Sequence, residues 1–129
     1  TFCDKKVAAL AKTKKGDGDP LDILVLSERA ISRSEVLVPS RVIGGLRMID
    51  RGEADDKIIA VLENDPTLTG IQELKDLPPT ILQRLTHYFT TYKLVPGQKN
   101  PAEIDSSYGT AHAYKVIEAA RQDYQDHFS

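Results

Sequence analysis

The sequence has little of what several functional classes require. Its single cysteine, Cys3, cannot form a disulfide within the chain, and no apolar stretch is long enough for a signal or membrane-spanning segment. The 17 Lys and Arg residues nearly balance the 19 Asp and Glu residues, which does not favour nucleic acid binding. We therefore expect a cytoplasmic protein that binds neither nucleic acid nor a membrane.

Histidine and cysteine are too sparse to suggest a reactive centre of their own. His87, His112 and His127 have no metal-like spacing. Cys3 has neither a neighbouring histidine nor a second cysteine, so we do not expect it to act as a nucleophile. Candidate chemistry must come from carboxylates, lysines and tyrosines.

The 129 residues are enough for one domain, with strands before helices. Residues 1–15 are expected to form a short helix and loop, 16–66 strands and metal-binding loops, and 67–129 a helical part. The strands are predicted at 23–26, 36–38, 41–49 and 57–62, and the helices at 81–92 and 107–128. Because strands and helices do not alternate, the pattern indicates an α+β fold.

The most informative segment is Asp17-Gly18-Asp19-Pro20-Leu21-Asp22, which leads into the apolar residues 23–26. Three carboxylates this close repel one another unless a cation neutralises them, and their hard oxygens suit Mg²⁺, Mn²⁺ or Ca²⁺ better than zinc. Gly18 permits a tight bend, and Pro20 restricts the backbone next to it. The segment predicts a divalent-metal site.

Other interpretations of these aspartates fit less well. An EF-hand loop that began at Asp17 would need glycine at its sixth position, which is Asp22, and its second half would be a strand. Aspartates that only cap a turn are common for an isolated Asp-Gly-Asp, but the third aspartate and a second acidic loop make this less favoured.

That second loop carries Asp50, Asp55 and Lys57, and a Tyr92-Lys93 pair follows at the end of a predicted helix. Taken alone, the second loop is typical of a solvated hairpin turn. Tyr92 lies on the apolar period of its helix, so a core tyrosine and a phosphate ligand are equally compatible with its position. The two loops together favour a shared site.

These three blocks, in this order, resemble soluble family I inorganic pyrophosphatases, whose signature is Asp-[Ser/Gly/Asn]-Asp-[Pro/Glu]-apolar-Asp. The resemblance implies metal-dependent hydrolysis of inorganic pyrophosphate to two phosphates, by a water activated between divalent cations. Mg²⁺ is the implied cation, with Mn²⁺ or other divalent ions as substitutes. It further implies roles for eight residues: metal ligands Asp17, Asp22, Asp50 and Asp55, catalytic base Asp19, and phosphate ligands Lys57, Tyr92 and Lys93.

The resemblance also implies an OB-like five-stranded antiparallel β-barrel with flanking helices, and a homo-oligomer. In that family a strand-rich segment with further phosphate ligands precedes the signature, whereas only 16 residues precede Asp17 here. We therefore expect the C-terminal portion of a pyrophosphatase, with an incomplete barrel and little activity by itself. The alternative is a noncatalytic OB-like binding module that retains a divalent-metal site.

Overall fold

A computed structural model describes residues 3–28, 37–91 and 102–128. Within these ranges, three α-helices and six strands follow one another, with short 3-10 helices at Pro66–Leu68 and Leu74–Asp76. Their order is α1 (Lys5–Ala11), β1 (Lys15–Gly16), β2 (Asp22–Leu26), β3 (Ser40–Asp50), β4 (Glu53–Ala54), β5 (Lys57–Leu62), α2 (Pro79–Thr91), β6 (Ala102–Tyr108) and α3 (Thr110–Phe128).

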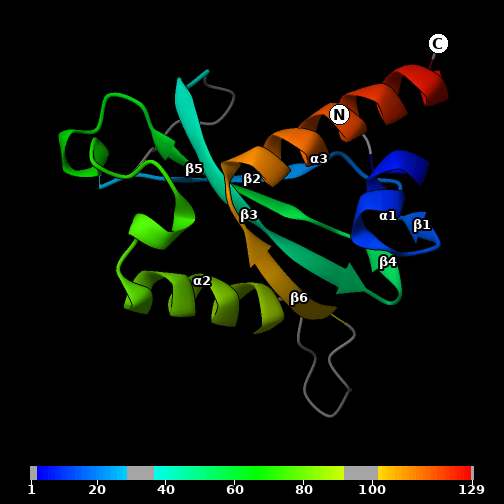
Figure 1. Cartoon of the computed structure of the whole chain (residues 1–129), viewed down its shortest axis with the longest axis horizontal. Coiled ribbons are helices and arrows are strands. Elements are labelled where there is room, and N and C mark those ends of the chain that lie inside the picture. Colours follow the sequence, from blue (N-terminus) through cyan, green and yellow to red (C-terminus); the bar gives the residue numbers. More distant parts are fainter. Residues whose placement is uncertain (1–2, 29–36, 92–101, 129) are drawn as a thin grey trace.

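All six strands form one mixed sheet in the order β1-β4-β3-β5-β2, with β6 paired to β3 (Figure 1). Strand β3 runs antiparallel to β4, β5 and β6, whereas β2 is parallel to β5 and β1 is parallel to β4. The α+β class is confirmed. The expected five antiparallel strands are wrong, because six strands are present and two pairs are parallel. The sheet of the described residues is not closed, and the prediction was of an incomplete barrel.

Helices cover both faces of the sheet, with α2 and α3 on opposite sides of the central strands (Figure 1). Successive side chains of a strand point to opposite faces, so Ile58 of β5 packs with Val7 of α1 and Val116 of α3. Its neighbour Ile59 packs in a second cluster with Phe89 of α2. A strand buried on both faces is almost continuously apolar, which explains the sequence of β5.

The longer predicted elements agree with the structure except near two segments, and the two-residue strands β1 and β4 were not predicted. The predicted strand at 36–38 is not observed at Leu37 and Val38, and Val36 lies outside the described residues. The second helix begins at Thr110 rather than at Ser107. The preceding residues form β6, which pairs with β3, so a long-range contact overrides the local helical pattern there.

A buried carboxylate on α3 holds the beginning of the chain in place. Asp123 is 2% exposed and accepts hydrogen bonds at 3.0 Å from the backbone N–H groups of Asp4, Lys6 and Val7. These N–H groups belong to the first turn of α1, where the helix itself offers no acceptor. The contact fixes the segment around Cys3, which supports the candidate site.

Within the described ranges, no helix is both long and apolar enough to cross a bilayer.

Candidate active site

The Asp17–Asp22 segment forms a braced turn. The N–H of Asp19 donates to Oδ1 of Asp17 at 3.0 Å, and Gly18 has a φ of 76°, which glycine adopts without strain. Cys3 supports the turn from the other side: its carbonyl accepts from Gly18 N–H at 3.0 Å, and its N–H donates to Asp19 O at 3.0 Å. The predicted tight turn is confirmed, and its backbone is held by the N-terminal segment, which was predicted only as a short helix and loop.

Strand pairing brings the second acidic loop beside this turn. The N–H of Asp17 donates to the carbonyl of Ala54 at 3.2 Å, and β2 and β5 are in register with Asp22 opposite Lys57. Both strands therefore start at the same edge of the sheet. This edge collects side chains from both predicted loops.

Lys57 is the centre of the contact between the two loops. Its Nζ donates to Oδ2 of Asp22 at 2.5 Å and to Oδ1 of Asp55 at 2.9 Å. The side chains of Lys57 and Asp55 are 3% and 7% exposed, whereas that of Asp22 is 62% exposed. Burial disfavours the charged ammonium, but the two carboxylates outweigh it and raise the pKa of Lys57 above its usual range.

The carboxylates are crowded. Burial, with a smaller contribution from the nearby Asp55, raises the pKa of Asp17 to about 7 against the opposing hydrogen bond from the N–H of Asp19. A bound cation would remove this repulsion. The oxygen donors of Asp17, Asp22 and Asp55 suit a hard divalent ion in charge and chemistry.

The arrangement is not a ready-made coordination shell. In the described part of the chain, no three His, Cys, Asp or Glu side chains are grouped so that they could hold a metal ion. The Lys57 ammonium instead lies between two of the predicted ligands, Asp22 and Asp55. Metal binding at these residues would require the ion pairs of Lys57 to rearrange.

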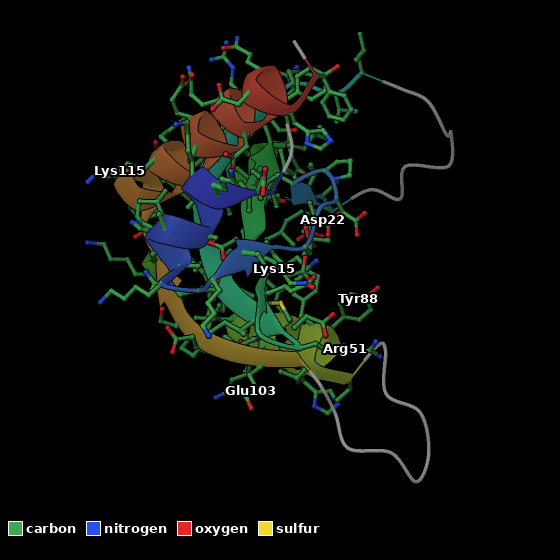
Figure 2. The ribbon with its side chains drawn as sticks, turned by 90° about the vertical axis from the view of Figure 1, so that its right-hand side faces the viewer. Lys15, Asp22, Arg51, Tyr88, Glu103 and Lys115 are labelled. Atoms are coloured by element: carbon green, nitrogen blue, oxygen red, sulfur yellow. The ribbon has the colours of Figure 1, made fainter. Side chains whose placement is uncertain are left out.

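Two hollows open at this edge. The first, which we call the acidic hollow, has a volume of about 330 Å³. The second, the lysine hollow, has a volume of about 230 Å³. Figure 2 shows Asp22, Arg51 and Tyr88 on the same side of the molecule. The acidic hollow is lined by Asp17, Asp19, Asp50, Arg51 and Glu53, and the lysine hollow by Asp22, Ile23, Leu24, Lys57, Tyr88 and Phe89.

Six of the eight predicted site residues thus come together at one edge. Asp17, Asp19 and Asp50 line the acidic hollow, Asp22 and Lys57 line the lysine hollow, and the buried Asp55 is bonded to Lys57. Tyr92 and Lys93 lie outside the described residues.

Sequence analysis did not single out Arg51, Tyr88 or Asp56. Arg51 lies inside the predicted second loop, and this position is the only sequence feature that could have marked it as a site residue. Tyr88 precedes the buried Phe89 on α2 and is exposed, and exposed tyrosines have no distinctive pattern. Asp56 stands between Asp55 and Lys57 but turns to the other side, where Tyr108 OH donates to its Oδ2 at 2.7 Å.

Asp56 is a buried support for the loop rather than part of either hollow. It is 2% exposed, and burial raises its pKa to about 6, although the hydrogen bond from Tyr108 and the charge of Arg47 oppose the rise. The Tyr108 ring lies against Gly45 of β3, where a Cβ would come within 2.5 Å of the ring. The pair links the Asp55–Lys57 segment to β6 and β3.

The chain is similar to known proteins of one family. A sequence model of the family described as inorganic pyrophosphatase matches residues 8–125. An inorganic pyrophosphatase of Chlamydia caviae is 50% identical over 125 residues, which are 93% of this chain and 58% of that protein. A Helicobacter pylori inorganic pyrophosphatase structure superposes with a TM-score of 0.74 and 34% identity, over 88% of this chain and 66% of its own.

A type I inorganic pyrophosphatase structure from Toxoplasma gondii superposes with a TM-score of 0.79 and 29% identity. The match covers 92% of this chain and 53% of the Toxoplasma chain. The chain spans a little over half the length of the Chlamydia relatives that it matches. The family model, which matches residues 8–125, covers nearly all of the described residues. The chain therefore belongs to the inorganic pyrophosphatase family.

Proposed function

We propose that this protein hydrolyses inorganic pyrophosphate to two phosphates with the help of divalent cations. The observation that carries the proposal is the meeting of Asp22 and Asp55 at Lys57, beside a hollow that Asp17 lines together with further carboxylates. The substrate is inferred from the relatives, which are named inorganic pyrophosphatase.

Asp17, Asp22, Asp50 and Asp55 would hold the cations, which we propose to be Mg²⁺, with Mn²⁺ or other divalent ions as substitutes. When bound, such ions neutralise substrate charge and lower the pKa of the attacking water. Their arrival would compete with the Lys57 ammonium for Asp22 and Asp55 and so release Lys57 toward an anion.

Asp19 is the group we propose as proton acceptor. It lies at the tip of the braced turn, is exposed and lines the acidic hollow. Among the described residues its carboxylate makes no hydrogen bond, whereas Asp17, Asp22 and Asp55 are all in contact with a charged partner. A carboxylate held in place by its backbone and without a competing donor is suited to accept the proton of the attacking water.

The phosphate ligands we propose are Lys57, Tyr92 and Lys93. Lys57 lines the lysine hollow, and its two carboxylate partners keep it protonated despite burial. An ammonium and a phenolic hydroxyl both donate strong hydrogen bonds to phosphate oxygens. A cytoplasmic location and a homo-oligomeric state belong to the same proposal and rest on the resemblance alone.

We further propose that the 129-residue chain alone has little activity. Phosphoryl transfer depends on positioning, and the relatives carry a large part of their length outside the matched region. The comparison requires two proteins at equal concentration in excess Mg²⁺: this chain, and the product of its complete reading frame. Equal turnover would contradict this part of the proposal.

The test of the function itself is phosphate release from pyrophosphate by the product of the complete reading frame. We expect turnover with Mg²⁺ and its loss in excess EDTA, because the crowded carboxylates repel an anion unless cations are present. Turnover that persists in EDTA would refute the metal dependence. Bound Mg²⁺ without turnover would instead identify a noncatalytic metal-binding module.

A further inference from the structure

The turn between β3 and β4 contains an arginine in an uncommon backbone conformation. Asp50 pairs with Glu53, so the connection consists of Arg51 and Gly52 alone, with φ values of 54° and 80°. Two central residues with positive φ are the pattern of a type I′ hairpin turn, in which asparagine, aspartate and glycine are preferred. Arginine has no such preference and its backbone is strained there.

The surroundings of Arg51 explain what its side chain can do. It lines the acidic hollow with Asp17, Asp19, Asp50 and Glu53. Among the described residues Arg51 nevertheless forms no ion pair. The nearby Glu53 is bonded to Lys15 instead, at 2.9 Å. Arg51 thus stands on a short turn at the rim of the hollow, is exposed, and within the described residues forms no ion pair with a carboxylate.

We propose that Arg51 is a further substrate-binding residue that contacts a phosphate group of pyrophosphate in the acidic hollow. The inference rests on the proposed function. Once cations neutralise the carboxylates of the hollow, those carboxylates no longer compete for the guanidinium of Arg51. The guanidinium can then pair with the anionic substrate, and its planar fork matches two phosphate oxygens. A strained residue at a candidate site also points to function, because the turn itself would be more stable with asparagine.

The chain offers a matched control for an asparagine variant. Lys12 is the other non-glycine residue with a positive φ in the described ranges, 58°, at the C-terminal end of α1. It is exposed and lines neither hollow. Arg51→Asn and Lys12→Asn each remove one positive charge and each place asparagine in a left-handed conformation, so they differ mainly in proximity to the hollow.

The experiment compares both variants with the wild type in the product of the complete reading frame. We expect both melting temperatures to be equal to or above that of the wild type. Arg51→Asn should raise the KM for pyrophosphate about 10- to 100-fold, the effect of losing one charge-assisted contact, with a smaller change in kcat. Lys12→Asn should leave KM unchanged, and Arg51→Lys, which keeps the charge without the fork, should be intermediate.

An unchanged KM in Arg51→Asn, with the melting temperature raised as in Lys12→Asn, would show that Arg51 serves only the turn. If Arg51→Asn does not fold, a wild-type KM in Arg51→Lys overturns the inference in the same way. If the wild type releases no phosphate, the proposed function fails separately. Calorimetric affinity for pyrophosphate then decides: Arg51→Asn weakens it if the inference holds and leaves it unchanged if it does not.

Discussion

The two ends of the site differ in how their charges are accommodated. At the buried end, Asp55, Asp56 and Lys57 are buried as whole residues, and each has a hydrogen-bond partner within the protein. At the open end, Asp19 and Arg51 are exposed, and within the described residues their side chains form no hydrogen bond or ion pair with the carboxylates beside them. The buried end fixes geometry, and the open end keeps groups available for a ligand.

This difference follows from the elements on which the residues stand. The buried end continues into β5, whose side chains pack between helices on both faces. The open end stands on two turns whose glycines, Gly18 and Gly52, have positive φ and open space where a side chain would begin. We therefore expect substitutions at the buried end to affect stability first, and those at the open end to affect ligands first.

The largest effect on stability should come from Lys57→Met. It leaves Asp55 buried without its cation, and breaking a buried pair in this way typically costs about 3–5 kcal/mol in the free energy of unfolding. Urea unfolding without metal measures it. Lys15→Met is the control, since its pair with Glu53 is at the surface and contributes about 0–1 kcal/mol. Equal losses in the two variants would erase the contrast between the ends.

At the open end, Asp19→Asn should lower kcat by about 10²- to 10⁴-fold, the usual contribution of a positioned base. Stability should change little, because Asp19 is exposed. Mg²⁺ affinity, measured by calorimetry, should fall less than in Asp22→Asn. If Asp19→Asn loses the metal and Asp22→Asn keeps it, the two assigned roles are reversed.

A smaller effect is expected behind the site, from Tyr108→Phe. The variant removes the donor to Oδ2 of the buried Asp56, and an unsatisfied buried acceptor costs about 1–3 kcal/mol. Chemical unfolding should show this loss, whereas Tyr114→Phe on the exposed face of α3 should stay within about 0.5 kcal/mol. An unchanged free energy of unfolding in Tyr108→Phe would mean that the hydrogen bond to Asp56 does not contribute to stability.

The smallest effect concerns pH. The pKa of Asp17 is raised to about 7 in the folded, metal-free protein from an ordinary value of 3.8, so the folded state binds more protons between these values. Its contribution to stability therefore falls as pH rises from about 4 to 7. Divalent-ion affinity should rise with pH over the upper part of that range, with proton release on binding. Calorimetry in buffers of different ionisation enthalpy measures the release, and Asp17→Asn should reduce it.

The accuracy of the sequence-based prediction differs between the helices and strands. Helix α2 and strands β2, β3 and β5 were predicted closely because each has a local apolar period and turn residues at its ends. Strand β6 was not, because its conformation is set by pairing with β3 rather than by its own residues. The metal and catalytic roles of the aspartates remain predictions, as do those of Tyr92 and Lys93.

The sequence by itself determined the turn at Asp17–Asp22 and the two acidic loops, since a turn depends on residues close together in the chain. Only the tertiary structure decided that Lys57 lies buried between Asp22 and Asp55, that Asp56 faces Tyr108, and that Arg51 lines the acidic hollow. These contacts depend on the register of paired strands and on burial. Both are long-range properties that no short stretch of sequence encodes.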